Sequence, residues 1–343
     1  MKNKPHILLT PCMILLLVLF QSCENEISYN GGNVAPKLTM NAFIYTDSLK
    51  NKLYLSMTGE TTIQSVSNSV VEVRVQGELK ETLNAIREEG TQLRTVEITT
   101  RFQPGDVVRI DAYTTDGEHH AWIEETVPHP VDIEQVDTSK VAVVPKPYYL
   151  TNKSLRVKVR FKDRPNEKNY YRIVLEQRHH VRGQSTGVAM SADLNEYGYW
   201  PWDDIALTDG RPATSEELDA DIFERVTNYY GVFDDSWFKD NEYTLNVQIP
   251  TGNRYYPPSL GFSPQYLDLD LAVRLLSITE AEFYYLTTMN MIDSDILEDY
   301  ISDPVKIPSN VQGGNGFVGI SSEKGKIIRL AENEKIQYAD PYR

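Results

Sequence analysis

Apolar and polar residues alternate with a period of two in short runs between residues 37 and 131. Val71, Val73 and Val75, for example, are separated by charged residues. Because successive side chains of a strand point to opposite faces, this alternation is typical of strands with one buried face. Turn residues separate the runs at near-regular spacing. The pattern predicts an antiparallel, immunoglobulin-like β-sandwich over residues 36–130.

A second β-rich region follows a break at Pro128-His129-Pro130, since proline cannot donate to a β-ladder. Apolar residues alternate with basic ones over residues 155–161, and the odd-numbered positions of residues 267–275 are apolar. We therefore expect a second β-sandwich-like domain over residues 131–335. Residues 336–343 are expected to form a C-terminal tail. The predicted fold class is thus mostly β.

The second region contains a long irregular insert at residues 182–241, which is rich in glycine, aspartate and aromatic residues. Inserts of this length in a sandwich are usually functional or partly mobile. A short helix is expected inside the insert over residues 215–228, because Thr214 and Glu217 have the spacing of a capping box.

A second helix is expected directly after Thr279. Thr279 and Glu282 have the capping-box spacing, and Ile278 stands where it can pack onto Phe283. Leu286 continues an apolar stripe with helical spacing. We expect this helix to be short.

The first 22 residues have the pattern of a secretory signal peptide. Lys2 and Lys4 form a short positive region, and Met13–Phe20 is an apolar run without charge. This run is too short for a membrane-spanning helix, which needs about twenty apolar residues. A basic start, a short apolar core and a small residue before a break predict a signal peptide over residues 1–22.

Ser22 directly precedes Cys23, and a small residue before a cysteine resembles the lipobox read by lipoprotein signal peptidase. We therefore expect cleavage before Cys23, lipidation of that cysteine with acyl chains such as palmitate, and a flexible polar tether over residues 23–35. The alternative is an ordinary secreted protein that is cut nearby. The other cysteine, Cys12, lies inside the predicted leader, so no disulfide is expected in the mature body.

Glu24 and Glu26 follow the lipidation site. Acidic residues at this place resemble the surface-export signal of Bacteroidota-type lipoproteins, which predicts an outer-membrane protein facing the cell exterior. The alternative is that both carboxylates are only solvated charges of the tether and that the body faces the periplasm.

The charge balance excludes some classes of partner. The chain has 34 Lys and Arg against 49 Asp and Glu, a formal net charge of −15. Nucleic acid binds to basic faces, so we expect no nucleic-acid partner. The same acidic excess disfavours peripheral binding to anionic lipid, so the expected membrane contact is the lipid on Cys23.

Several segments, in order along most of the mature chain, carry a family pattern: residues 23–27 with 36–43, 169–172, 232–235 with 242–243, 283–286, and the closing stretch 303–319. These segments resemble the domain-of-unknown-function 4249 lipoproteins. That family is similar in context to Bacteroidota surface lipoproteins whose genes lie beside those of TonB-dependent outer-membrane transporters. The resemblance implies an accessory lipoprotein of such a transporter, and it supplies no catalytic residues.

The closing stretch also has a physical interpretation. Pro304 and Pro308 forbid a helix there. The glycines at 313, 314 and 316 permit positive φ or a close approach of two backbones. Residues 317–321 are then expected to add a strand to the sheet. Structural need and ligand contact are both open as explanations of the motif.

The patterns of known metal and catalytic sites do not occur in the sequence. His119-His120 and His179-His180 are adjacent pairs, and adjacent residues of a strand point to opposite faces, so neither pair chelates by itself. The mature chain has no Gly-x-Ser-x-Gly elbow, no His-Glu-x-x-His motif and no phosphate-binding glycine loop. We expect no metal, no cofactor and no catalytic residue. A converging pair of glycosidase carboxylates is left open as an alternative.

An aromatic segment inside the insert is the predicted contact site for a partner or ligand. Four aromatic residues stand beside two carboxylates: Tyr197, Tyr199, Trp200, Trp202, Asp203 and Asp204. Exposed aromatics rimmed by acids suit recognition of a partner or ligand. The alternative is that they fill the interface between insert and sandwich, because large aromatics are commonly core residues.

These features predict an outer-membrane lipoprotein that faces the cell exterior and helps a TonB-dependent transporter to capture or admit a small ligand or peptide. A structural or adhesive surface lipoprotein without a transporter is the first alternative. An unrecognised hydrolase is the second.

Overall fold

The structure is a computed structural model that describes residues 35–59, 62–142, 153–185, 187–197, 204–210, 226–250, 263–294 and 305–336. Residues from Pro36 onward form one compact unit. Its described part is mostly β, as the alternation predicts. Within those ranges, no helix combines the length and the apolar character needed to cross a bilayer. Most of the helix predicted over residues 215–228 lies outside the described residues.

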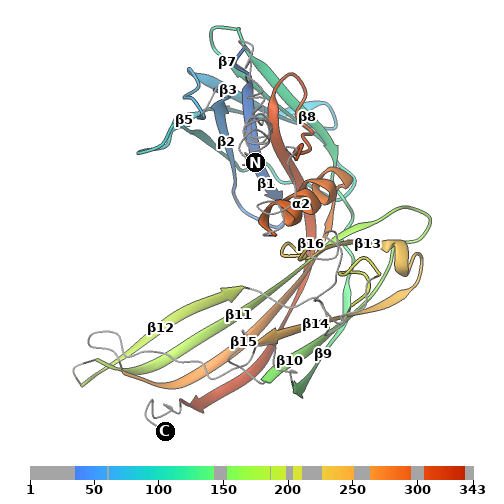
Figure 1. The fold of residues 1–343 in the computed structure, drawn as a ribbon. Helices are drawn as coiled ribbons and strands as arrows, with labels where there is room; N and C mark the ends of the chain where they lie inside the picture. Colours follow the sequence, from blue (N-terminus) through green and yellow to red (C-terminus); the bar gives the residue numbers. More distant parts are fainter. Residues whose placement is uncertain are drawn as a thin grey trace, which may run out of the picture. The chain divides into compact units, whose positions relative to one another are not determined.

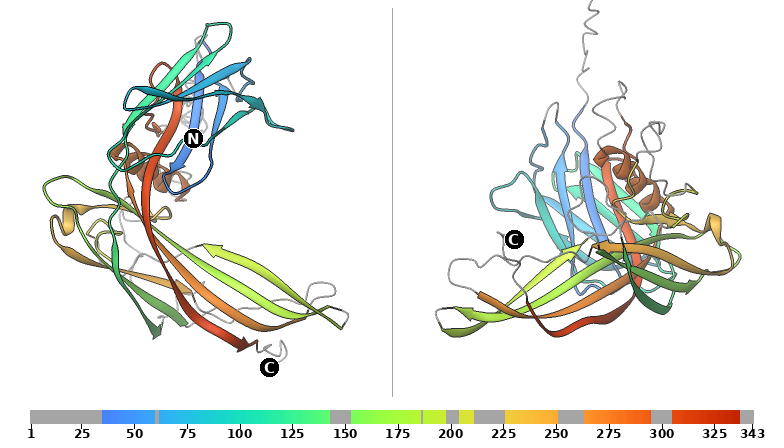
Figure 2. Two further views of the ribbon diagram at one scale, coloured as in Figure 1. Left: turned by 180° about the vertical axis from the view of Figure 1, so that it is seen from behind. Right: turned by 60° about the horizontal axis from the view of Figure 1, so that its bottom comes forward.

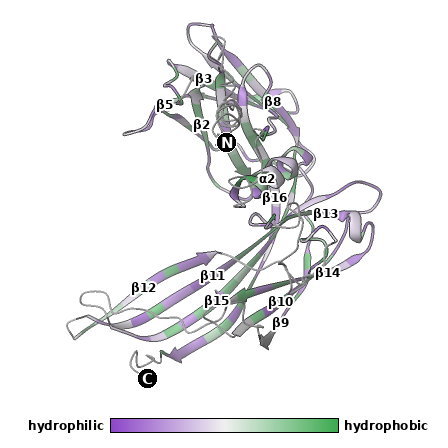
Figure 3. Ribbon diagram, in the orientation of Figure 1, coloured by the Kyte–Doolittle hydropathy of each residue, from purple (hydrophilic) through white to green (hydrophobic). Residues whose placement is uncertain are grey.

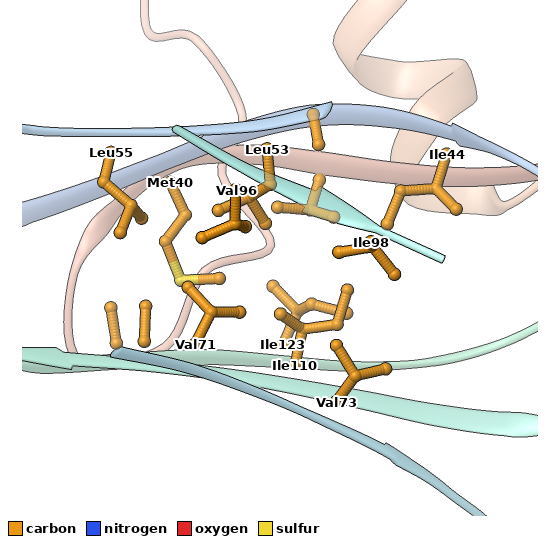
Figure 4. Packing of buried hydrophobic residues seen from close by; sticks show 14 of the residues in the cluster. Met40, Ile44, Leu53, Leu55, Val71, Val73, Val96, Ile98, Ile110 and Ile123 are labelled. Carbon is orange, nitrogen blue, oxygen red and sulfur yellow. The ribbon is translucent and has the colours of Figure 1, made fainter. Parts of the chain in front are cut away.

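The first half is a sandwich of two sheets. In order of pairing, one sheet contains β1 (Leu38–Tyr45), β2 (Asn51–Met57), β6 (Arg94–Ile98) and β5 (Ile86–Arg87). The other contains β4 (Glu78–Asn84), β3 (Ser69–Val75), β7 (Val107–Thr114) and β8 (His120–Thr126). Alternate side chains of both sheets meet between them (Figure 4), among them the fully buried Met40, Leu53, Val71, Ile110 and Ile123.

The second half contains two more sheets. The long strands β12 (Val188–Tyr197), β11 (Tyr170–Ser185), β15 (Ser263–Ile278) and β16 (Asn315–Lys335) pair in that order, and β13 (Val232–Asp234) pairs with β11. Figure 2 shows the four long strands side by side in both views. A three-stranded sheet contains β14 (Glu242–Pro250), β10 (Lys153–Lys162) and β9 (Ile133–Ala142). One 3-10 turn, η2 (Asp235–Trp237), follows β13.

Aromatic side chains are prominent in the second core. The ring of Phe161 on β10 lies 5.6 Å from the ring of Tyr171 on β11 and 5.5 Å from that of Phe238. Phe238 in turn stacks on Tyr243 of β14 at 4.3 Å. Side chains of the large and the small sheet therefore share one core, so this half is also a sandwich.

β16 belongs to both halves. Its residues 315–321 pair in parallel with β1, and from Ser322 onward it pairs antiparallel with β15. The strand can be followed alongside β1 and then β15 in Figure 1. Val318 and Ile320 are fully buried in the first core. The first sandwich therefore contains strand residues from far along the chain, which the predicted range 36–130 leaves out.

The predicted irregular insert at residues 182–241 contains regular structure. β11 continues to Ser185, and β12 returns antiparallel to it as a ten-residue strand. The prediction of an irregular stretch was wrong for this segment. The sequence of β12 does alternate, with apolar residues at 188, 190, 192 and 194, but nearly all of its side chains are exposed, and the prediction of an irregular stretch passed over this short pattern.

The glycines of the closing stretch satisfy a structural need. Gly316 has a φ of +99°, and a Cβ atom there would lie 2.1 Å from the carbonyl oxygen of Met40. Only glycine permits both this dihedral angle and this approach of β16 to β1. The prediction of positive φ or a close backbone approach is confirmed at this position.

Helix α2 (Glu280–Asp293) confirms the predicted helix, but only half of its capping box forms. The Thr279 hydroxyl accepts the Glu282 N–H at 3.2 Å. The Glu282 carboxylate does not return this bond: it is 1% exposed, and neither oxygen has a hydrogen-bond partner within the described part of the chain. It instead points at β16, where a Cβ atom at Gly319 would lie 2.6 Å from its Oε2.

Burial raises the pKa of the Glu282 carboxyl to about 7, from a usual 4.5, although Arg172 acts in the opposite direction. The folded protein then retains a proton that the unfolded chain releases near pH 4.5. The contribution of Glu282 to the free energy of unfolding is therefore highest below pH 4.5, falls as the pH rises from about 4.5 through about 7, and is constant above that range. We expect the free energy of unfolding to fall by on the order of 3 kcal/mol over this window. Glu282→Gln should remove this fall and be the more stable protein at pH 8.

Urea unfolding at pH 5, 6, 7 and 8 measures this effect. Glu332→Gln, at an exposed site on β16, is the matched control and should keep the pH dependence of the wild type. An identical pH slope in the wild type and Glu282→Gln would show that Glu282 does not titrate in this range.

We also expect a fragment of residues 36–130 to be unfolded, because it lacks the strand that places Val318 and Ile320 in its core. Burying two such side chains contributes about 1.5–3 kcal/mol each, a large part of the stability of a small domain. A fragment in which residues 305–322 are joined through a flexible linker should fold. Amide dispersion in NMR spectra and cooperative urea unfolding distinguish the two fragments. Cooperative unfolding of residues 36–130 alone would contradict this expectation.

Candidate functional site

The two faces of the long-stranded sheet differ in character. On β11 the odd-numbered Ile173, Leu175 and Val181 are buried on the apolar face. The even-numbered residues 172–182 lie on the opposite face, where most of them are charged. Figure 3 shows this alternation as apolar and polar bands along the strand. We call the second face, on β12, β11, β15 and β16, the charged face.

Glu176 is the least exposed acid of the charged face. It pairs across the sheet with Tyr197 on β12, whose hydroxyl donates to its Oε1 at 3.0 Å. The Arg178 guanidinium donates to its Oε2 at 2.8 Å. Burial acts to raise the pKa of Glu176, but the hydrogen bonds from Arg178 and Tyr197 outweigh it, so the pKa lies below its usual value. Glu176 is therefore a carboxylate at neutral pH.

Further carboxylates lie beside basic side chains across the face. Asp193 on β12 lies 2.6 Å from the Nδ1 of His180 on β11. Asp268 on β15 lies 3.1 Å from Arg182 on β11, and Asp270 lies 2.5 Å from Arg329 on β16. Most of these side chains are between a fifth and half exposed. These pairs form a row across the charged face that solvent reaches, and we call this row of side chains the ladder.

A more buried pair stands at the inner end of the charged face. Arg274 on β15 donates from its Nε to both Glu323 oxygens at 2.9 Å. The hydrogen bond to Glu323 raises the pKa of Arg274. Its guanidinium also lies 5.8 Å from the ring centre of Tyr45. This geometry fixes Arg274 between β16 and β1.

The structure places two of the six predicted contact residues. Tyr197 is 62% exposed, and its hydroxyl bond to Glu176 leaves the ring at the rim of the charged face. Asp204 is only 2% exposed. Tyr199, Trp200, Trp202 and Asp203 lie outside the described residues, as does Cys23.

Asp204 stabilises the local structure through three hydrogen bonds. Its carboxylate accepts the N–H groups of Ala206 at 3.0 Å and Asn246 at 2.7 Å, and the hydroxyl of Tyr243 at 2.7 Å. Burial raises its pKa in spite of these bonds. Asp204 therefore ties residues 204–210 to β14 and is not an acidic rim for exposed aromatics.

The aromatic residues downstream in the insert divide between core and surface. Phe233 and Phe238 are buried in the second core. Trp237 is 49% exposed, and its indole lies against Gly210, where a Cβ atom would be 2.4 Å from the ring. Packing and exposure thus both occur in the insert.

Sequence reasoning missed Glu176, Arg178 and Arg274 as members of a site. The available pattern was the polar alternation of residues 172–182, which marks the outer face of a long strand. Within the described ranges, no three His, Cys, Asp or Glu side chains gather where they could hold one metal ion.

Comparison with solved structures finds similarity to a DUF4785 family protein from Legionella pneumophila subsp. pneumophila, at 10% identity and a TM-score of 0.24. The match covers 72% of this chain and 54% of that chain, so it spans about half the length of that protein. A TM-score this low supports no inference about fold or function. No curated protein matches the chain.

The family described as Domain of unknown function (DUF4249) matches residues 24–327. The match runs through the strands of the first sandwich, most of the charged face and the shared part of β16. The chain therefore belongs to the DUF4249 family.

Proposed function

We propose that this protein is a lipid-anchored outer-membrane protein that faces the cell exterior and serves a TonB-dependent transporter as an accessory for ligand capture. The observation that carries the proposal is the charged face, with exposed Tyr197 at its rim. In this proposal the lipid on Cys23 holds the body at the membrane. The charged face then receives the ligand or contacts the transporter.

The composition of the charged face suggests the class of ligand. Six positive groups (Arg172, Arg178, Arg182, Arg274, Arg329, Lys335) stand against five carboxylates (Glu176, Asp193, Asp268, Asp270, Glu323), a difference of one. The whole chain has a net charge of −15. The face is thus nearly neutral on a strongly acidic protein. It suits a ligand that carries both charges, such as a peptide.

The ladder can exchange its partners at small cost. Exposed ion pairs contribute only about 0–1 kcal/mol each, because water screens them and two side chains must be held in one geometry. A ligand carboxylate or ammonium group can therefore replace one member of a pair without loss of stability. Exposed aromatic and arginine side chains together are typical of interface contacts.

We expect Cys23→Ser to release the protein from the membrane, because the substitution removes the acylation site. Metabolic labelling with palmitate should label the wild type and not the variant. Protease added to intact cells should digest the wild-type body if it faces the exterior. Membrane retention of Cys23→Ser would contradict the lipid anchor, and protection from protease in intact but not lysed cells would place the body in the periplasm.

Pull-down of the lipidated protein in mild detergent, with partners identified by mass spectrometry, tests the accessory role. We expect stoichiometric recovery of a TonB-dependent transporter, reduced about tenfold or more in the double variant Tyr197→Ala with Arg178→Ala. Loss of roughly 1.4 kcal/mol of contact energy suffices for this reduction.

Glu78→Ala with Lys80→Ala is the matched control, because it removes an exposed ion pair on β4, away from the charged face. Circular dichroism of each variant shows whether it is folded. Recovery of the lipoprotein alone would favour the structural or adhesive alternative over a transporter accessory.

A further inference from the structure

Among the described residues, β12 is an edge strand that lacks the lysine, the proline and the bulge by which many sheet edges are protected. Among the described residues it pairs only with β11, in a ten-residue register without a bulge. Its sequence Val188–Tyr197 carries two acids, Asp193 and Glu196, but no proline or lysine. Edge strands of soluble proteins ordinarily carry such devices, because their free N–H and C=O groups pair readily with another chain.

The other described sheet edges are protected. β8 is bridged to Gln312 through Trp122. β14 donates the N–H of Asn246 to Asp204, and β5 has only two residues. β4 and β9 each carry a lysine. The part of β16 beyond Ser321, which pairs only with β15 within the described ranges, carries Lys324 and Lys326. β12 is thus the longest of these edges with neither lysine nor proline.

β12 also carries a row of exposed apolar side chains. Val188, Met190 and Leu194 lie on one face of the strand and are 64%, 49% and 50% exposed. Ala192 lies between Met190 and Leu194 on the same face. Isolated exposed apolar residues are ordinary, but a stripe of them along a free edge is typical of an interface.

We propose that β12 pairs with β12 of a second copy of this chain, antiparallel about a two-fold axis at Ala192, to form one continuous sheet. In this register Met190 of each copy lies opposite Leu194 of the other, which makes two apolar cross-strand pairs. Asp193 lies opposite Ser191, and Glu196 lies opposite Val188. No like charges face each other over the nine paired residues.

The charges and the length of β12 favour this register over the two registers whose axes lie one residue away. A two-fold axis at Asp193 would place two aspartates directly opposite each other, which is destabilising. An axis at Ser191 would pair only seven residues of the strand. The axis at Ala192 gives the longest overlap that keeps like charges apart. A self-complementary patch of this kind is what a two-fold dimer requires.

Single-cysteine crosslinking tests both the partner and the register. The mature chain with Cys23→Ser has no other cysteine. Ala192→Cys then places two thiols opposite each other across the axis, where opposite Cβ atoms are about 4.5–5.5 Å apart. We expect rapid formation of a disulfide-linked dimer under mild oxidation. Ala189→Cys on the same strand is the matched control and should not crosslink, because its counterpart would lie opposite Asn195.

Sedimentation of the chain without added cysteines gives an independent measurement. We expect a concentration-dependent dimer that Leu194→Lys weakens by about tenfold or more, because the substitution acts at both symmetric pairs. Leu194 is exposed, so thermal unfolding of the variant should match that of the wild type at concentrations where both are monomeric. A monomer at all concentrations, or equal crosslinking of Ala192→Cys and Ala189→Cys, would overturn the proposal. In native membranes the test uses Ala192→Cys in the lipidated chain, where the lipid occupies the Cys23 sulfur, and crosslinking there to a different protein only would also overturn the proposal.

Discussion

The continuous backbone of β16 is the constraint on which both sandwiches depend. It pairs with β1 up to Ser321 and with β15 from Ser322, without an intervening loop. Side chains of a strand alternate strictly, so a slip by one residue moves every side chain to the other face. A slip against β1 would remove Ile320 from the first core and Ile328 from its place beside the second. The register in one sandwich therefore fixes the register in the other.

Helix α2 is fastened where β16 passes from one sandwich to the other. Tyr285 on the helix stacks on Phe317 of β16 at 4.1 Å, and Phe43 of β1 lies 5.7 Å from the same ring. Gly319 next to this stack lets the helix approach close enough to bury Glu282. A buried carboxyl without a hydrogen-bond partner disfavours its charged form, which links the packing of the helix to protonation. The same close approach that fixes α2 thus makes the junction sensitive to pH.

The sequence predicted those elements whose signals are local. Residues 155–161 and 267–275 alternate because one face of each strand is buried, and the Thr279 cap marks the start of α2. The parallel pairing of β1 with β16 joins residues about 276 positions apart, as in Asn41 with Phe317. No local pattern indicates such a contact.

The residues of the proposed contact site were predicted only in part, for a related reason. Tyr197 is exposed, as expected for a contact residue, but Asp204 seven positions later is buried by bonds to Tyr243 and Asn246 of β14. Because these residues are close in sequence, one acidic and aromatic cluster was expected. The fold instead exposes Tyr197 and buries Asp204. Glu176 joins the proposed site through pairing of β11 with β12, a strand whose short apolar alternation at residues 188–194 the prediction of an irregular insert passed over.

The large sheet is longer than its core requires, and the contact surface that we propose lies on this surplus length. β11 and β15 have 16 residues each, whereas β10 and β14 of the facing sheet have ten and nine. At about 3.3 Å per residue, roughly 20 Å of the large sheet extends beyond what the smaller sheet can cover. Val181, Leu267 and Leu269 form a separate small cluster on this outer part. Because the second core does not need this length, exposed apolar residues, a free edge and exchangeable ion pairs there cost little stability. The outer part of β12, β11 and β15 is thus the region in which sequence can vary for binding without disturbing either core.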